Sequence, residues 1–284
     1  MYELWLERAG YPSRLAAISG APKHLYCEGV ALNELHGRPF VAVVGSRKLT
    51  DYGREVTKTI VRELARQGVV IVSGLALGID SVAHQAVLDA NGTTIAVLPS
   101  TLEAIYPATH RQLAAKIVAN GGALVTEYGE DNPVNQGSYV ARNRIISGLS
   151  LAVIIPEAAE RSGSLHTANF ALEQGREVLV VPGSIFSPTS KGTNKLLQAG
   201  AAAITSVDDV FELLKLERTS ENALIGSSDV EQAILKVLQA GQTDAQTLFE
   251  KSNLPIREFN QALTTLEITG RITQSGQAWT LRGV

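Results

Sequence analysis

Residues 41–53 read VAVVGSRKLTDYG, and this stretch is the clearest indication of the fold: a strand, a glycine turn and the start of a helix. Its first four residues are apolar and favour a short buried strand. Gly45 permits a sharp turn, after which Thr50 or Asp51 can cap a helix that begins near Tyr52. Because backbone N–H groups are unpaired at a helix start, this succession predicts an anion site.

Ser46 and Arg47 follow the glycine at the mouth of the predicted turn. A hydroxyl beside a guanidinium suits a phosphate ligand, since both groups donate hydrogen bonds to oxygen. The alternative is an ordinary strand-to-helix turn whose arginine is only solvated. From this stretch alone, the two interpretations are equally good.

Composition limits the classes of protein that this chain can represent. Its 284 residues can bury a large domain and a small one. No apolar run reaches the ~18 residues of a membrane span, and the charged start MYELWLERAG does not resemble a secretory signal. The single cysteine, Cys27, excludes an internal disulfide or a cysteine-based metal cluster and fits a reducing cytoplasm. The net charge of −3 argues against a broad basic surface, so any polyanion site must be local.

Apolar segments alternate with amphipathic ones from residue 41 onward. The segments predicted as strands are residues 41–44, 69–74, 93–98, 122–127, 151–158, 177–183 and 201–205. Continuous apolar strands separated by helices predict an α/β fold with a mostly parallel sheet and helices on both faces. Such folds bind ligands beyond the carboxyl ends of their strands, so the loops after the strands are the candidate site.

Three further loops of this kind contain glycine and small polar residues. They are SGLALGIDSVAH (73–84), EAAERSGSLHTANFALEQG (157–175) and PGSIFSPTSKGTNKLLQAG (182–200). Together with the turn after Val44, they predict a row of backbone donors suited to phosphate, with Gly74, Gly163, Ser164, Lys191 and Lys195 as contacts. The alternative is that small residues merely let helices pack closely on the strands.

The segment 135–150, NQGSYVARNRIISGLS, places an aromatic residue beside arginines. Tyr139 could stack on an unpaired base, which is worth ~1–3 kcal/mol. Arg142 and Arg144 are two residues apart, so on a helix they point about 200° away from each other. We expect one of them to contact phosphate, near Asn143, and the other to tie the helix to the sheet.

Several segments together resemble the DprA/Smf family of DNA-processing proteins. They are VAVVGSRKLTDYG, SGLALGIDSVAH, TIAVLPSTLEAIYPATH, RNRIISGLS, SGSLHTANFALEQGREVLVVPG and GTNKLLQAGA, within residues 11–209. The resemblance implies an extended Rossmann-like fold that binds single-stranded DNA, typically as a homodimer. It further implies a recombination mediator that loads the RecA recombinase in natural transformation, without a cofactor or a metal ion.

Individual positions match or depart from the family pattern. Arg47 matches the arginine of the family's GSR motif, and Gly45 and Ser46 match its neighbours. Tyr139 stands where the family often has phenylalanine, and Val140 where many members have proline. Together with the loops and the segment 135–150 described above, the resemblance gives a predicted DNA contact set of Gly45, Ser46, Arg47, Gly74, Tyr139, Arg142, Asn143, Arg144, Gly163, Ser164, Lys191 and Lys195.

The ends of the chain differ in composition from its middle. Residues 1–36 are predicted as a short helical extension, 37–215 as the Rossmann-like domain and the polar residues 216–227 as a linker. Residues 228–284 predict three helices and a hairpin, which is a winged helix. Residues 226–284 contain five Lys and Arg against six Asp and Glu. This module is therefore predicted to contact proteins or to bind DNA weakly.

The rival functional class is enzymatic. Rossmann-like phosphoribohydrolases of the lysine-decarboxylase-like group carry a PGGxGTxxE loop, and in the nearest stretch, SGSLHTANF, Phe170 replaces the glutamate. Glu127, Glu157 and His84 remain as possible acid–base groups, but the sequence pairs none of them with a nucleophile. His84 is more simply a packing residue, and Asp80 a helix cap.

Overall fold

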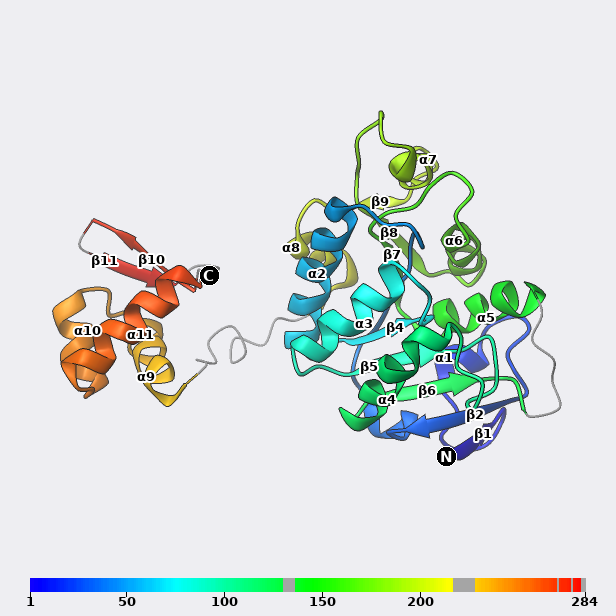
Figure 1. Cartoon of the computed structure of the whole chain (residues 1–284), viewed down its shortest axis with the longest axis horizontal. Helices are drawn as coiled ribbons and strands as arrows, with labels where there is room; N and C mark the ends of the chain where they lie inside the picture. The colour runs from blue at the N-terminus through cyan, green and yellow to red at the C-terminus, as the bar shows by residue number, and fades with distance from the viewer. Residues whose placement is uncertain (130–135, 217–227, 270, 277, 282–284) are drawn as a thin grey trace. The chain divides into compact units, whose positions relative to one another are not determined.

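The computed structural model describes residues 1–129, 136–216, 228–269, 271–276 and 278–281. Contacts divide the chain into two compact units, Met1–Glu217 and Arg218–Val284 (Figure 1). Apart from Leu216, the predicted linker lies outside the described residues.

One sheet of nine strands, counted within the described residues, organises the first unit. Its order is β1-β2-β6-β5-β4-β3-β7-β8-β9. All seven predicted strands are present and parallel: β3 (Phe40–Val43), β4 (Val70–Ser73), β5 (Thr94–Val97), β6 (Ala123–Thr126), β7 (Ala152–Ile155), β8 (Glu177–Val180) and β9 (Ala202–Ala203). The predicted mostly parallel α/β fold is confirmed.

Helices cover both faces because the strands are apolar on both sides. Ala42, Val72 and Val153 face one cluster, which α5 and α6 complete. Val41, Ile71 and Ile154 face the other, against α2 and α3. Successive residues of a strand thus serve opposite cores. The helices and short 3₁₀ turns of this unit are α1 (Ser13–Ala16), η1 (Leu32–Leu35), α2 (Asp51–Arg66), α3 (Ile79–Asp89), η2 (Ala108–His110), α4 (Arg111–Ala119), α5 (Gln136–Leu149), α6 (Ser164–Glu173), η3 (Pro188–Ser190), α7 (Lys191–Gln198) and α8 (Val207–Leu214).

The first 36 residues contain strands, so the prediction of a short helical extension there is wrong. β1 (Tyr2–Trp5) and β2 (His24–Gly29) form an antiparallel pair, and β2 continues the sheet by pairing antiparallel with β6. Leu25 and Cys27 are buried between this pair and the helices, which fixes the register. These residues therefore belong to the core of the Rossmann-like unit.

The second unit has its own core. α9 (Asp229–Gln239), α10 (Ala245–Ser252) and α11 (Ile256–Ile268) pack around Leu235, Phe259 and Leu266. β10 (Ile272–Ser275) and β11 (Ala278–Leu281) form an antiparallel hairpin whose Trp279 closes that core. Three helices followed by this hairpin are the predicted winged helix.

Among the described residues, the helices are all too short or too polar to cross a membrane.

Candidate nucleic-acid interface

A small cavity of about 200 Å³ opens at the carboxyl edge of the sheet, where the parallel fold predicts a ligand site. Four segments form it: the loop after β3, the loop after β4 with the first turn of α3, the first turns of α5, and the start of α6 with the loop before it. Its lining residues are Val44, Gly45, Arg47, Ala76, Asp80, Tyr139, Val140, Arg142, Asn143, Ser162, Gly163, Ser164, His166 and Thr167.

Arg47 and Tyr139 form the outer wall of this cavity. The guanidinium carbon of Arg47 lies 5.7 Å from the centre of the Tyr139 ring. Tyr106, from the loop after β5, packs edge-on against Tyr139 with ring centres 5.8 Å apart. Arg47 is exposed and Tyr106 is 56% exposed. A cation and two rings thus stand together at the surface, an arrangement that suits a phosphate and a base at once.

Arg142 and Asp80 form the floor. Arg142 is only 4% exposed, and its Nη1 donates to the carbonyl oxygens of Gly74 (2.6 Å) and Val97. Burial lowers the pKa of Arg142 to about 10, although the charge of Asp80 opposes this shift. Burial likewise raises the pKa of Asp80, against the charges of Arg142 and Arg47. The floor is therefore a buried pair of opposite charges, and Arg47 is the exposed cation of the cavity.

Arg144 points away from the cavity. Its Nη2 lies 2.6 Å from Glu127 Oε2 and its Nη1 2.8 Å from Glu127 Oε1, just after β6. Its Nε also donates to Gly20 O. The two arginines of the RNR motif therefore point to different parts of the sheet: Arg142 to the ends of β4 and β5, and Arg144 to the end of β6 and to the loop before β2. Both tie α5 to the sheet, and a phosphate contact by either stays a prediction.

The start of α2, predicted from residues 41–53 as an anion site, is already occupied. Thr50 caps the helix, as its Oγ1 accepts a hydrogen bond from Gly53 N. The buried Glu157 carboxylate accepts hydrogen bonds from Thr50 N and Thr50 Oγ1, both at 2.9 Å. An internal carboxylate thus fills the position of the expected phosphate, and that part of the prediction is wrong.

The starts of α3 and α7 are occupied as well. Ile79 N donates to Ser46 O, and Gly192 N donates to Ala158 O. A Cβ on Gly78 would lie 2.1 Å from Ser46 O, and one on Gly192 2.5 Å from Ala159 O. At these turns the alternative interpretation holds, because glycine allows neighbouring loops to pack against the helix starts. Asp80 does not cap α3: its carboxylate accepts from Gly74 N and Ala76 N and holds the loop after β4.

Helix α6 is different, because its start faces the cavity. Its first N–H groups are paired within its own turn: Ser164 N donates to Ser162 Oγ, Leu165 N to Ser162 O and His166 N to Gly163 O. Ser162 Oγ and Ser164 Oγ lie 2.8 Å apart at this turn. A Cβ on Gly163 would meet nothing within 4 Å, so the space before this helix is open. Among the four glycine-containing turns, this one leaves the positive end of its helix dipole facing the cavity, although its N–H groups already have partners.

The cavity brings together seven of the twelve predicted contact residues: Gly45, Arg47, Tyr139, Arg142, Asn143, Gly163 and Ser164. Ser46 and Gly74 lie just behind it, and the Ser46 hydroxyl is used in its own turn, donating to Lys48 O. Lys191 and Lys195 lie on α7 outside the cavity, and Lys195 forms an ion pair with Glu160. The sequence analysis did not predict Tyr106 as a site residue, nor Asp80 as part of the cavity floor. Tyr106 lies in TIAVLPSTLEAIYPATH, one of the segments that resemble the family, and this resemblance could have identified it.

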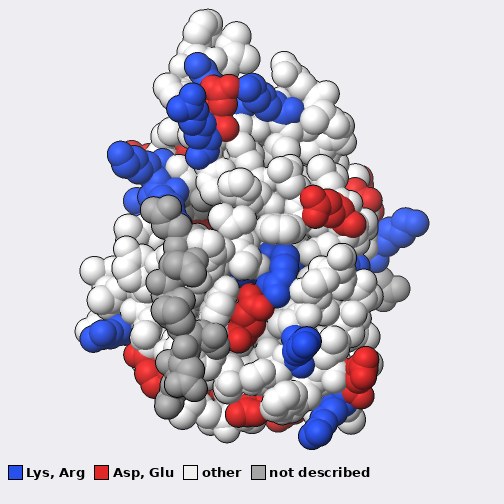
Figure 2. All heavy atoms as spheres, turned by 90° about the vertical axis from the view of Figure 1, so that its right-hand side faces the viewer, with Lys and Arg blue, Asp and Glu red and all other residues white. Residues whose placement is uncertain are grey.

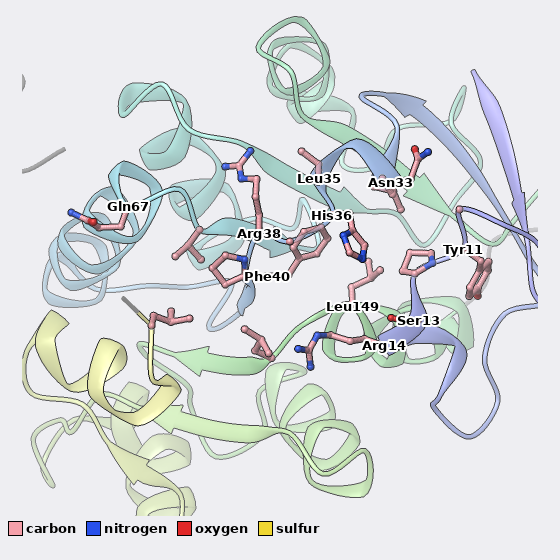
Figure 3. A pocket seen from close by; sticks show the side chains of 18 of the residues that line it. Tyr11, Ser13, Arg14, Asn33, Leu35, His36, Arg38, Phe40, Gln67 and Leu149 are labelled. Carbon is pink, nitrogen blue, oxygen red and sulfur yellow. The ribbon is translucent and has the colours of Figure 1, made fainter. Parts of the chain in front are cut away.

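A larger cavity of about 860 Å³ lies at the opposite, amino-terminal edge, where Phe40 begins β3 (Figure 3). Arg14, Arg38 and Lys215 line it, and none of its lining residues is Asp or Glu. However, α2, α5 and α8 end there, and helix C-termini attract cations. Arg38 Nε donates to Gly68 O at 2.9 Å, just after α2. Arg38 therefore complements the end of α2, and the helix C-termini at this edge make it a poorer anion site than the carboxyl edge.

The three possible acid–base groups of the rival enzyme are engaged elsewhere. Glu127 pairs with Arg144, and Glu157 binds Thr50. His84 is fully buried, with Nδ1 2.8 Å from Thr94 Oγ1, and burial lowers its pKa to about 3. It is a packing residue, as the sequence suggested. Among the described residues, His, Cys, Asp and Glu form no group that could hold a metal ion.

Comparison with known proteins agrees with this architecture. A family profile described as DNA recombination-mediator protein A matches residues 3–215, and one described as the DprA winged helix domain matches residues 218–277. The chain belongs to the DprA/Smf family. It is 41% identical to Protein Smf of Escherichia coli over 272 residues, which cover 92% of this chain and 72% of that protein. It is 44% identical to DNA processing protein DprA of Bacillus subtilis over 204 residues, covering 72% and 68%.

Two DprA structures resemble the first unit. The crystal structure of the Streptococcus pneumoniae protein has a TM-score of 0.69 at 39% identity, covering 74% of this chain and 73% of that one. The Helicobacter pylori protein has a TM-score of 0.68 at 34% identity, covering 77% and 98%. The latter structure concerns the binding of single-stranded DNA to that protein.

Proposed function

We propose that this protein binds single-stranded DNA at the small cavity on the carboxyl edge of the sheet. The observation that carries the proposal is the pairing of the exposed Arg47 guanidinium with the Tyr139 ring, 5.7 Å apart, beside the start of α6. The family membership supports the same class of ligand, since the H. pylori relative is described as a single-strand binder.

Each element of the cavity has a role in this proposal. Arg47 binds a phosphate beside the start of α6, because a guanidinium and the positive end of a helix dipole both favour negative charge. A neighbouring base stacks on the Tyr139 ring. Phosphate contacts of this kind position the strand without reading its sequence. A duplex would not fit, since its bases are paired and cannot stack on an external ring.

The role in the cell follows from the family. We propose a recombination mediator that protects incoming single strands and loads the RecA recombinase onto them during natural transformation. Like typical members, it would act in the cytoplasm as a homodimer, without a cofactor or a catalytic step. The binding cavity supports a non-enzymatic role, because its buried carboxylate, Asp80, already accepts two backbone hydrogen bonds.

A salt-titrated binding experiment with single-stranded and duplex oligonucleotides tests this function. The protein should prefer the single strand, with a log–log salt slope of about −2 to −3 for three or four phosphates. Arg47→Ala should weaken binding about tenfold or more, since hydrogen bonds to charged groups are strong. Lys48→Ala is the matched control, because Lys48 is an adjacent exposed cation outside the cavity lining.

Two results would contradict the proposal. Equal affinity of the folded Arg47→Ala and Lys48→Ala variants would reduce Arg47 to a solvated surface residue. Release of a free base from a nucleotide would favour the rival phosphoribohydrolase, because a pure binder leaves the glycosidic bond intact.

A further inference from the structure

An exposed apolar tip stands on the same edge of the sheet, outside the cavity. It is formed by Ile185 and Phe186, in the loop between β8 and α7, which are 76% and 88% exposed. This loop lies at the top of the first unit beside α7 (Figure 1). Single exposed apolar residues are common, but two adjacent ones at the tip of a loop on the ligand-binding edge form a candidate contact surface.

Hydrogen bonds hold the loop that carries this tip. The Asn194 side chain accepts from Gly183 N (3.3 Å) and donates to Gly183 O (3.0 Å). The Tyr52 hydroxyl donates to Pro182 O at 3.0 Å, which ties the loop to the start of α2. Ser187 N donates to Ser184 O and closes the turn at the tip. The loop base is therefore ordered by the protein, while the Phe186 ring is presented to solvent.

Basic side chains surround the base of this loop. Glu160 pairs with Lys195, whose hydrogen bond lowers the pKa of Glu160, and the charges of Lys191 and Arg161 lower it further. All three cations are exposed. Figure 2 shows Lys and Arg gathered around acidic atoms at the top of the molecule, whereas lower on that face the two signs are interspersed. One acidic group against three cations leaves a local positive charge on a chain whose net charge is −3.

We propose that this tip is a second contact for the single strand, at which Phe186 stacks on a base while Arg161, Lys191 and Lys195 bind adjacent phosphates. The proposal rests on the proposed function. The loop after β8 is two strand positions from the loop after β3, or about 10 Å along the edge. A strand bound at Arg47, in the loop after β3, would cross this spacing and the length of the loop after β8 to reach Phe186, and single-strand sites span ~4–16 nucleotides.

The test compares oligothymidylates of four and fifteen nucleotides, written dT4 and dT15, by fluorescence anisotropy at low salt. Phe186→Ala should weaken dT15 at least about fivefold, the lower end of the loss for one base–aromatic stack. It should leave dT4 unchanged, because dT4 occupies only the cavity. Phe186→Leu should behave like Phe186→Ala and Phe186→Tyr like wild type, since stacking needs a ring. Ile268→Ala, an exposed apolar residue of α11, is the control.

For a second variant we expect tighter binding, a result that damage to the fold would not produce. Glu160→Gln removes the acidic group among the three cations, so it should tighten dT15 by about two- to fivefold and leave dT4 unchanged. Unchanged or weaker dT15 binding by Glu160→Gln would overturn the inference.

Three other results separate the possible errors. If wild type binds neither oligonucleotide, the proposed function itself is wrong. If wild type binds both and Phe186→Ala matches it on dT15, only the tip contact is wrong. If Phe186→Ala weakens dT15 while light scattering shows a changed oligomeric state, the tip is instead a contact between copies of this chain.

Discussion

Arg142 and Arg144 have different surroundings although only Asn143 separates them. The helical repeat directs their side chains apart, which the sequence predicted. The sequence could not predict which would be tied down, because their partners come from distant strands. Glu127 follows β6 and binds Arg144 at 2.6 Å, and Val97 ends β5 and accepts from Arg142. Arg142 lines the cavity, but it also ties α5 to the sheet, so it is less available to phosphate than Arg47.

Tyr139 offers the sharpest test at a single residue. Tyr139→Phe should bind single-stranded DNA within about twofold of wild type, because the ring supplies the stacking surface. Tyr139→Ala should lose about five- to 150-fold, corresponding to ~1–3 kcal/mol per stacked base. Anisotropy titrations on one oligonucleotide measure both. If the Phe variant were as weak as the Ala variant, the hydroxyl would be the important group and the stacking argument would fail.

His84 makes the stability of the protein depend on pH. The Thr94 hydroxyl donates its proton to Ile71 O, so the His84 Nδ1 must donate to Thr94 Oγ1. His84 Nε2 is then a buried acceptor without a partner among the described residues. Burial, with help from the charges of His110 and Arg142, lowers the folded-state pKa from 6.5 to about 3.

The sign of the effect follows from this lowered pKa. Well above pH 6.5, His84 is neutral in both the folded and the unfolded chain, so its protonation does not reduce the free energy of unfolding. As the pH falls from 6.5 toward 3, His84 becomes protonated in the unfolded chain but stays neutral in the folded one, so the free energy of unfolding decreases. The loss is about 2 kcal/mol between pH 7 and pH 5. Denaturant titrations should show that His84→Asn flattens this part of the pH profile. Parallel profiles for the two proteins would contradict the assignment.

At the scale of elements, helix starts were the least predictable feature. The sequence identified four glycine turns, and all four exist. Whether the helix start after each turn is free or bound to another group depends on contacts between distant segments. Glu157 reaches Thr50 from 107 residues away. Local sequence cannot distinguish an anion site from a start filled by an internal carboxylate or carbonyl. The position of the start of α6 at the cavity emerges only when the loops are assembled.

The N-terminal strands were missed for a related reason. β1 is four residues long, and its alternation of half-buried and exposed side chains is too short to be recognised as a strand. Its residues become a strand because β2 pairs with it and with β6, nearly 100 positions later in the chain. Most of the parallel strands were predictable because they are largely apolar runs buried on both faces, as in β4, β5, β6 and β7.

At the scale of the whole molecule, the topology located the site better than the cavities did. The parallel sheet directs attention to its carboxyl edge, and seven predicted residues meet there in a cavity of about 200 Å³. The cavity of about 860 Å³ lies at the other edge, among helix C-termini. Size alone would select the other cavity, whereas the proposed ligand needs exposed donors and a ring more than it needs volume.

The division into two units leads to the last prediction. A chain ending at Glu217 should fold, since the first unit has its own cores and Leu216 still packs against them. The cavity residues and the Phe186 tip all precede this point. Residues 226–284 carry five basic against six acidic residues, so they add little electrostatic attraction for DNA. The shortened protein should therefore bind single-stranded DNA within about threefold of the full chain, or under 1 kcal/mol.

Anisotropy titrations of both proteins on the same oligonucleotide measure this difference, with light scattering to compare their oligomeric states. Ile256 and Ile268 are 56% and 79% exposed on α11, which fits a surface for protein partners better than one for phosphates. Loss of recombinase loading with unchanged DNA affinity would agree with that role. A tenfold loss of DNA affinity, with the shortened protein folded and its oligomeric state unchanged, would instead mean that the winged helix contacts the strand directly.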